Sequence, residues 1–271
     1  MVNSLSIFFM AVSLIISIGL PSALIIFVKK KYKSSLKPFV IGILGFFISS
    51  QILENLFHLY VLKVNTTTST FLANSTIAYA IYGALAAGVF EETGRFICYK
   101  YFLKNNRNFL DGISYGIGHG GIEAILIGGL ASINALSYAL LINSGKLTSI
   151  LGQAGVSTDV INQTINAYIN ASSFSFLLTG FERILAIGIH IGLSILVLYA
   201  VRNRKNIYYF LAILLHTLVD FPAVLTQKGI INIYIMYGII IVEVIFILIF
   251  AFKLLKPKFT ITEDNLNSYT N

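Results

Sequence analysis

Long apolar stretches separated by short polar segments make up most of the chain. An α-helix needs about 20 apolar residues to cross a bilayer, and seven stretches are close to that length or longer. They cover residues 4–28, 38–62, 77–102, 111–141, 173–200, 206–226 and 231–253. The fourth and the fifth are long enough to tilt in the bilayer or to protrude from it. The pattern predicts an all-α fold: a polytopic membrane helix bundle of about seven transmembrane helices.

Composition supports a membrane protein rather than a soluble domain. Charged residues make up 11% of the chain and hydrophobic residues 56%, whereas a soluble domain carries about 25% charged residues. The first apolar stretch has no basic segment before it and is too long for a cleaved signal sequence, so we expect it to remain as a span. The net charge of +8 comes largely from residues that flank the spans, so we expect no nucleic-acid partner.

Lysine and arginine gather in alternate connections between the predicted spans. Of the 19 such residues, 14 lie in the segments 29–37, 100–107, 202–205 and 253–258. The intervening loops hold only Lys63, Lys146 and Lys228. Cytoplasmic loops of membrane proteins are enriched in these residues, so we expect the N-terminus outside and the C-terminus in the cytoplasm. We expect a single transmembrane domain over residues 1–258 and a polar cytoplasmic tail over residues 259–271.

The longest predicted external loop, residues 142–172, has apolar residues at helical spacing. They are Val156, Val160, Ile161, Ile165, Tyr168 and Ile169. This spacing predicts an amphipathic helix that lies on the membrane surface. Such a helix could cap the bundle, or it could act as a lid that admits a substrate.

Ionisable side chains inside the spans are the strongest functional signal, because each costs roughly 2.5–3.5 kcal/mol to insert. They include Glu54, His58, Glu91, Glu92, Arg95, His119, Glu123, Glu182, Arg183, His190, His216, Asp220 and Glu243. Seven of them are predicted to lie near the middle of four successive spans: Glu91, Glu92, His119, Glu123, His190, His216 and Asp220. Glu54, His58 and Glu243 lie on other spans, apart from this group of ionisable residues. Glu182 and Arg183 lie nearer the outer end, which favours a structural role.

Spacing indicates which of these side chains share a helix face. Residues four apart are neighbours on a helix, and three such pairs are Glu91 with Arg95, His119 with Glu123, and His216 with Asp220. Glu92 points about 100° away from Glu91. We therefore expect Arg95 to neutralise and orient one glutamate while the other faces the centre of the bundle.

This combination of residues favours hydrolysis by one of two routes. A glutamate beside an imidazole can take a proton from water, and a second imidazole can stabilise a developing oxyanion. Alternatively, two histidines and one or two carboxylates from separate helices can hold zinc with a position left open for water. We expect no serine nucleophile, and the zinc-binding spacing HExxH is absent from the sequence.

Three segments resemble a known family. The sequences "EETGR" (91–95), "YGIGHGGIEA" (115–124) and "HTLVD" (216–220) are similar to motifs of the glutamate-dependent intramembrane proteases. That group contains the CAAX prenyl endopeptidases, the bacteriocin-processing proteins and their PrsW relatives. The likeness is greatest to the YhfC-type membrane peptidases, and it covers the third to the sixth predicted span.

The resemblance implies a role for each residue. Glu91, or its neighbour Glu92, would be the base that activates water together with His119. His216 and Asp220 would stabilise the oxyanion or share a metal ion. If a metal such as zinc is used, the implied ligands are His119, His216, Glu91 and Asp220. Arg95 would anchor a glutamate, and Glu123 and His190 would be further residues of the pocket.

The chain departs from the prenyl endopeptidase pattern in two places. Its Glu-Glu-x-x-Arg motif is one residue shorter than theirs, as in PrsW-like proteins. It also has Asp220 where they often have asparagine, and an ionised aspartate cannot donate to an oxyanion. Asp220 would therefore stay protonated, orient His216 or bind a metal.

We expect an intramembrane protease that cleaves a membrane-associated or lipidated protein or peptide. Its expected location is the cell membrane of a bacterium, as a multi-pass protein in contact with the lipid bilayer. Two alternatives remain open from the sequence. One is a proton-coupled transporter, and the other is a non-catalytic immunity or binding protein of the membrane.

Overall fold

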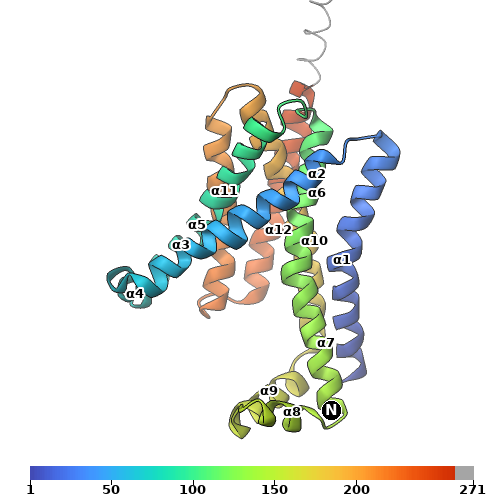
Figure 1. Ribbon diagram of the computed structural model, residues 1–271, viewed down its shortest axis with the longest axis vertical. Coiled ribbons are helices and arrows are strands. Elements are labelled where there is room, and N and C mark those ends of the chain that lie inside the picture. The colour runs from blue at the N-terminus through green and yellow to red at the C-terminus, as the bar shows by residue number, and fades with distance from the viewer. Residues whose placement is uncertain (260–271) are drawn as a thin grey trace, which may run out of the picture. The chain divides into compact units, whose positions relative to one another are not determined.

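A computed structural model describes residues 1–259, which form helices joined by short connections, with no strand in that part of the chain (Figure 1). The predicted all-α fold is therefore confirmed. The α-helices are α1 Ser4–Tyr32, α2 Lys37–Phe46, α3 Asn55–Leu59, α4 Thr66–Ala73, α5 Thr76–Ile97, α6 Phe109–Glu123, α7 Leu130–Asn143, α8 Leu147–Gln153, α9 Thr158–Asn170, α10 Ser173–Arg202, α11 Ile207–Gln227 and α12 Ile233–Ile249. The π-helical segments are η1 Phe47–Glu54, η2 Tyr60–Val64, η3 Cys98–Phe102, η4 Ala124–Gly129 and η5 Phe250–Leu255.

Six helices are long and apolar enough to cross a membrane, and they match six of the seven predicted spans. They are Ser4–Tyr32, Lys37–Val64, Phe109–Asn143, Ser173–Arg202, Ile207–Gln227 and Ile233–Phe259. The remaining predicted span, residues 77–102, falls on α5 and η3. This segment meets the criterion for a span only together with α4, from which it is bent by 118°. Its charged residues Glu91, Glu92, Arg95 and Lys100 lower its hydropathy. The orientation of the termini stays a prediction, and the predicted tail after residue 259 lies outside the described residues.

The fold divides into two compact units, so the single domain over residues 1–258 stays a prediction. One unit consists of Met1–Ala23 and Glu123–Ala186, and the other of Leu24–Ile122 and Ile187–Asn271. We call them the first and the second unit. Long helices such as α1 and α10 contribute to both. The candidate site described below lies in the second unit.

The first unit contains the predicted amphipathic helix. The structure confirms a helix there, α9, which begins after Ser157, whose hydroxyl accepts a hydrogen bond from the amide of Val160. Ile161 is 1% exposed, and the Tyr168 ring stacks on Tyr138 with centroids 5.7 Å apart. Helix α9 is thus anchored by one apolar face, and its place on the membrane surface stays a prediction.

Glycines in the second unit let helices approach very closely, as small residues do in membrane proteins. A Cβ on Gly42 of α2 would overlap the backbone carbonyl of Tyr115 on α6. A Cβ on Gly116 would likewise overlap the backbone of Ile191 on α10. Helix α6 is therefore held between α2 and α10, which positions His119 one turn further along.

Replacing Gly42 with alanine is expected to destabilise the protein by about 1–3 kcal/mol, because the added methyl group cannot be accommodated against a backbone carbonyl. Gly238 on α12 is the matched control, since a Cβ there meets no atom within 4 Å. Thermal unfolding in detergent checks this. A Gly42→Ala protein that unfolds at the same temperature as the wild type would contradict the close approach of α2 and α6.

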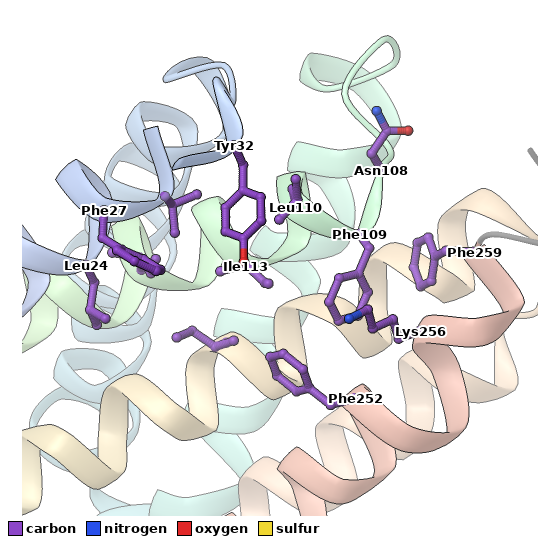
Figure 2. A pocket seen from close by; sticks show the side chains of 13 residues that line it. Leu24, Phe27, Tyr32, Asn108, Phe109, Leu110, Ile113, Phe252, Lys256 and Phe259 are labelled. Atoms are coloured by element: carbon purple, nitrogen blue, oxygen red, sulfur yellow. The ribbon is translucent and has the colours of Figure 1, made fainter. Parts of the chain in front are cut away.

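An apolar cavity of about 600 Å³ in the second unit is lined by residues of α1, α6 and α10 and of the segment from η5 to Phe259 (Figure 2). Aromatic rings form much of its wall, contributed by Phe27, Phe109, Phe252 and Phe259. Its polar lining groups come from Tyr32, Asn108 and Lys256. No histidine or carboxylate lines it, so it is not a candidate for the hydrolytic chemistry.

Candidate metal and catalytic site

Four helices of the second unit bring the predicted mid-membrane residues together. Helix α5 carries Glu91, Glu92 and Arg95, α6 carries His119, α10 carries His190, and α11 carries His216 and Asp220. Glu92, Arg95 and His119 are 0% exposed, and Glu91, His190 and His216 are at most 6% exposed. Helices α5 and α11 approach each other closely at Gly88, because glycine has no side chain. A Cβ at this position would lie 2.7 Å from Oγ1 of Thr217.

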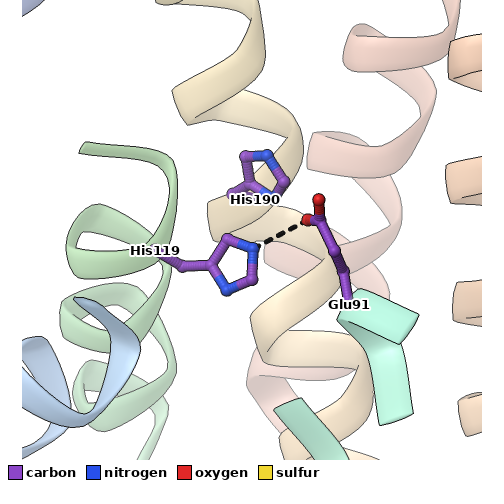
Figure 3. A group of neighbouring side chains, drawn as sticks. All are labelled: Glu91, His119 and His190. Carbon is purple, nitrogen blue, oxygen red and sulfur yellow. Dashed lines mark hydrogen bonds and ion pairs between the residues drawn. The ribbon is translucent and has the colours of Figure 1, made fainter. Parts of the chain in front are cut away.

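Glu91, His119 and His190 form a compact group of potential metal ligands (Figure 3). One ligand atom from each lies within 4.8 Å of the others. Nε2 of His119 is 2.8 Å from Oε2 of Glu91, and the two imidazole rings have centroids 4.6 Å apart. Within residues 1–259 this is the group of acidic, cysteine and histidine side chains that meets the geometry for a metal ion.

Glu92 turns away from this group towards a different pair of residues. Its Oε1 lies 2.8 Å from Nδ1 of His216 and 3.4 Å from Nη2 of Arg95. The spacing suggested that Arg95 pairs with Glu91, four positions before it. In the structure, Arg95 instead pairs with Glu92, three positions before it. One glutamate is neutralised by an arginine, while Glu91 faces His119.

Arg95 also contacts His190, which constrains the protonation of that ring. Nη2 of Arg95 lies 3.0 Å from Nδ1 of His190. A guanidinium group can only donate, so Nδ1 accepts and the proton of a neutral ring lies on Nε2. A metal ligand needs a free lone pair. Metal binding by His190 therefore requires that Arg95 release Nδ1 or that the imidazole ring turn over.

His216 links the two glutamates to a more accessible carboxylate. Its Nδ1 contacts Glu92, and its Nε2 lies 3.9 Å from Oε2 of Glu91 and 3.5 Å from Oδ2 of Asp220. The Asp220 side chain is 35% exposed, whereas the His216 side chain is 5% exposed. The His216 ring thus lies between Glu91, which is buried, and Asp220, which is more exposed.

Glu123 lies in the first unit and has a local partner there. Nη1 of Arg183 donates to its Oε1 at 2.9 Å, and Arg183 also contacts its neighbour Glu182. Arg183 is 5% exposed, whereas the Glu182 side chain is 42% exposed. The structural role expected for Glu182 and Arg183, and the role of Glu123 in a pocket, stay predictions.

His190 is the residue whose place in the structure differs most from the role implied by the resemblance. The ligand set implied by resemblance was His119, His216, Glu91 and Asp220, with His190 only as a supporting residue. The geometry instead groups His190 with Glu91 and His119. His190 has no acidic residue four positions away, so the pairing rule could not select it. Its depth, shared with the other two histidines, was the available signal.

One segment has the spacing of a motif that carries a nucleophilic serine, although we expect no serine nucleophile. Residues 112–116, "GISYG", match G-x-S-x-G. That motif exposes its serine at a sharp turn from a strand to a helix. Ser114 lies within α6 and not at such a turn, so this segment lacks the structural context of that motif.

The donor set fits a catalytic metal ion. Two imidazoles and one carboxylate are ligands used by hydrolytic zinc sites, which keep a fourth position for water, and by non-haem iron sites. All three side chains are buried, and Nδ1 of His119 is a buried ring nitrogen that has no hydrogen-bond partner. The group is therefore a possible metal-binding triad, subject to the condition on His190 given above.

Comparison with known proteins agrees with this geometry. The family model described as "YhfC intramembrane metalloprotease" matches residues 12–245. The chain belongs to this YhfC family. It is 44% identical over 232 residues to the "Uncharacterized membrane protein YhfC" of Bacillus subtilis (strain 168), a match that covers 86% of this chain and 89% of that protein. No solved structure matches the chain.

Membership of the YhfC family confirms the resemblance found in the three motifs. It also confirms a multi-pass membrane protein, since the relative is named a membrane protein and the helices are long enough to span. The family's description, an intramembrane metalloprotease, supports a membrane protease at the level of the family. The match includes all seven residues of the cluster, from Glu91 to Asp220.

Proposed function

We propose that this YhfC protein is a zinc-dependent protease that hydrolyses a peptide bond of a membrane-embedded or lipidated protein. The observation that carries the proposal is the buried group of Glu91, His119 and His190, which brings ligand atoms from three helices within 4.8 Å. Placing these costly groups together inside an apolar bundle is difficult to explain by packing alone.

Glu91, His119 and His190 would hold the metal ion. When bound, zinc supplies a Lewis acid that polarises the scissile carbonyl and makes water a better nucleophile. The burial of the three ligands excludes bulk water from the group, which strengthens electrostatic interactions at the reacting atoms. Arg95 and Glu92 neutralise each other beside the site, at a distance of 3.4 Å.

His216 is the residue best placed to move protons. Because Nδ1 donates to Glu92, the neutral ring presents the lone pair of Nε2 towards Glu91 and Asp220. That nitrogen can accept a proton from water and pass it to the leaving amine. Glu92 holds the ring in this tautomer, as a carboxylate does in a catalytic triad. The base is then His216, whereas the resemblance implied Glu91.

A comparison of protein termini in bacterial membranes tests the proposal. Cells would carry the wild type, Glu91→Gln or Asp159→Asn at matched expression. Asp159 is the control, because it is exposed in the first turn of α9. We expect a set of new termini with the wild type and the control that disappears with Glu91→Gln. If Glu91→Gln leaves every terminus in place while the assay detects a known protease, the chain is not acting as a protease through this site.

A further inference from the structure

The second unit contains a second polar cluster, formed by Glu54, His58 and Tyr82. Nε2 of His58 lies 3.2 Å from Oε1 of Glu54, and Nδ1 of His58 lies 2.5 Å from the hydroxyl of Tyr82. A neutral His58 that donates to Glu54 accepts the Tyr82 proton at its other nitrogen. The contacts join α3 to α5.

His58 and Tyr82 line a cavity of about 330 Å³ that also reaches Asp220. Tyr79 and Gln227 add further polar groups to its wall. Phenol, imidazole, amide and carboxylate groups together offer both donors and acceptors. Five of the ten lining residues carry a polar side-chain group, so the wall differs from the largely aromatic wall of the cavity in Figure 2.

The cavity adjoins the candidate site along two helices. On α5, Gly83 and Ala87 line it, and Glu91 follows one turn after Ala87. On α11, Asp220 lines it, and His216 lies one turn before, with Nε2 3.5 Å from Oδ2 of Asp220. The cavity therefore occupies the stretch between the buried site and one end of the two helices.

That end is opposite to the basic connections. Helix α5 begins there at Thr76 and α11 ends there at Gln227. The ammonium group of Lys228, just beyond, lies 4.1 Å from the centroid of the Tyr79 ring. If the loops rich in lysine and arginine are cytoplasmic, the cavity opens towards the outer face of the membrane.

The size and polarity of the cavity indicate what it can hold. A volume of about 330 Å³ is at the lower end of small-ligand pockets, which is too small for a helix about 10 Å in diameter. An extended peptide exposes backbone amides that lipid cannot satisfy. The polar wall can satisfy them, and the small residues Gly83, Ala87 and Ala223 leave room for a backbone.

We propose that this cavity is the access site through which water and an extended segment of the substrate peptide reach the site from the outer face. The proposal rests on the proposed function, because it assigns the cavity to the peptide that the metal group would cleave. His58 is then a positioning residue, which holds Tyr82 in the wall through a contact that the catalytic cluster does not share.

Cysteine labelling tests access without any measurement of activity. In a Cys98→Ser background, Ala223→Cys would be exposed in intact cells to a small, negatively charged methanethiosulfonate reagent that does not cross membranes. We expect labelling at least about ten times faster than for Ala84→Cys, which is the control because Ala84 is 0% exposed. Ser35→Cys, in the basic connection after α1, should be labelled only after the cells are opened.

Two results of the labelling would overturn the proposal. One is Ala223→Cys reacting as slowly as Ala84→Cys from either side of the membrane. The other is Ala223→Cys reacting from the same side as Ser35→Cys. The control at Ser35 makes the second result informative, since it reports the orientation of the basic connections in the same preparation.

Blocking the cavity separates this proposal from the proposed function. A Cβ on Gly83 would lie 3.8 Å from Val224, so Gly83→Ala should be tolerated, whereas Gly83→Leu should fill the space. We expect Gly83→Leu to lower the appearance of Glu91-dependent termini at least about tenfold with zinc content unchanged. Gly238→Leu, on an exposed face of α12, should have no such effect. Full cleavage by Gly83→Leu would reject the access site, while loss of cleavage by Glu91→Gln would still support the protease.

Discussion

Replacing His190 with alanine is expected to weaken zinc binding by at least about 100-fold. Structural zinc sites with four ligands bind with about 10–16 kcal/mol, so one ligand is worth roughly 3 kcal/mol, or about two orders of magnitude in Kd. His190 lies in the group with Glu91 and His119, and no other described residue completes a set of three within the same distance. The zinc affinity of the purified protein, measured by competition with a chromophoric chelator, checks the prediction.

Asp220→Asn distinguishes this ligand set from the one implied by resemblance. If Glu91, His119 and His190 hold zinc, Asp220→Asn should leave the affinity within a few-fold of the wild type. His58→Ala is a second control, because His58 contacts Glu54 and Tyr82 instead of the metal group. The opposite result, in which Asp220→Asn loses zinc and His190→Ala keeps it, would assign the metal to His119, His216, Glu91 and Asp220.

Replacing Arg95 with alanine is expected to lower the free energy of unfolding by about 3–5 kcal/mol, because it leaves a buried charge without its partner. Arg95 and Glu92 are both 0% exposed and lie 3.4 Å apart. Arg95 also donates to the backbone carbonyl of His190 at 3.3 Å, and its guanidinium lies 5.9 Å from the centroid of the Tyr115 ring. The one side chain thus ties α5 to both α6 and α10.

Thermal unfolding in detergent, with and without zinc, checks the effect of Arg95→Ala. Arg95→Lys should fall between the wild type and the alanine variant, because lysine keeps the charge but loses the planar set of donors. Arg204→Gln is the control, since Arg204 is exposed in the connection between α10 and α11. An Arg95→Ala protein as stable as Arg204→Gln would mean that Glu92 is not a buried, ionised partner.

The order and positions of the spans were accessible from the sequence, because the bilayer acts on each segment separately. A helix satisfies its backbone hydrogen bonds within one segment, so length and hydropathy suffice to locate it. The exception is instructive. The span of α5 contains Glu91, Glu92, Arg95 and Lys100 and passes the same criterion only with α4. The charged residues of the proposed site thus lower the hydropathy by which a span is recognised.

The residue types of the site were also accessible, because charged side chains inside apolar stretches stand out. Their pairing was not. Helical spacing placed Arg95 beside Glu91, but in the structure Arg95 pairs with Glu92, and Glu91 contacts His119. The two choices differ by about 100° around a helix, and only packing against neighbouring helices selects between them.

The helices, their order and the polar residues inside them could therefore be predicted from the sequence. Which side chains contact one another depends on how the helices pack. His190 joins Glu91 and His119, and His58 joins Tyr82 beside the cavity that reaches Asp220. The cost of burying a charge is local and can be read from composition, whereas partners such as His119 for Glu91 and His216 for Glu92 come from helices distant in the chain.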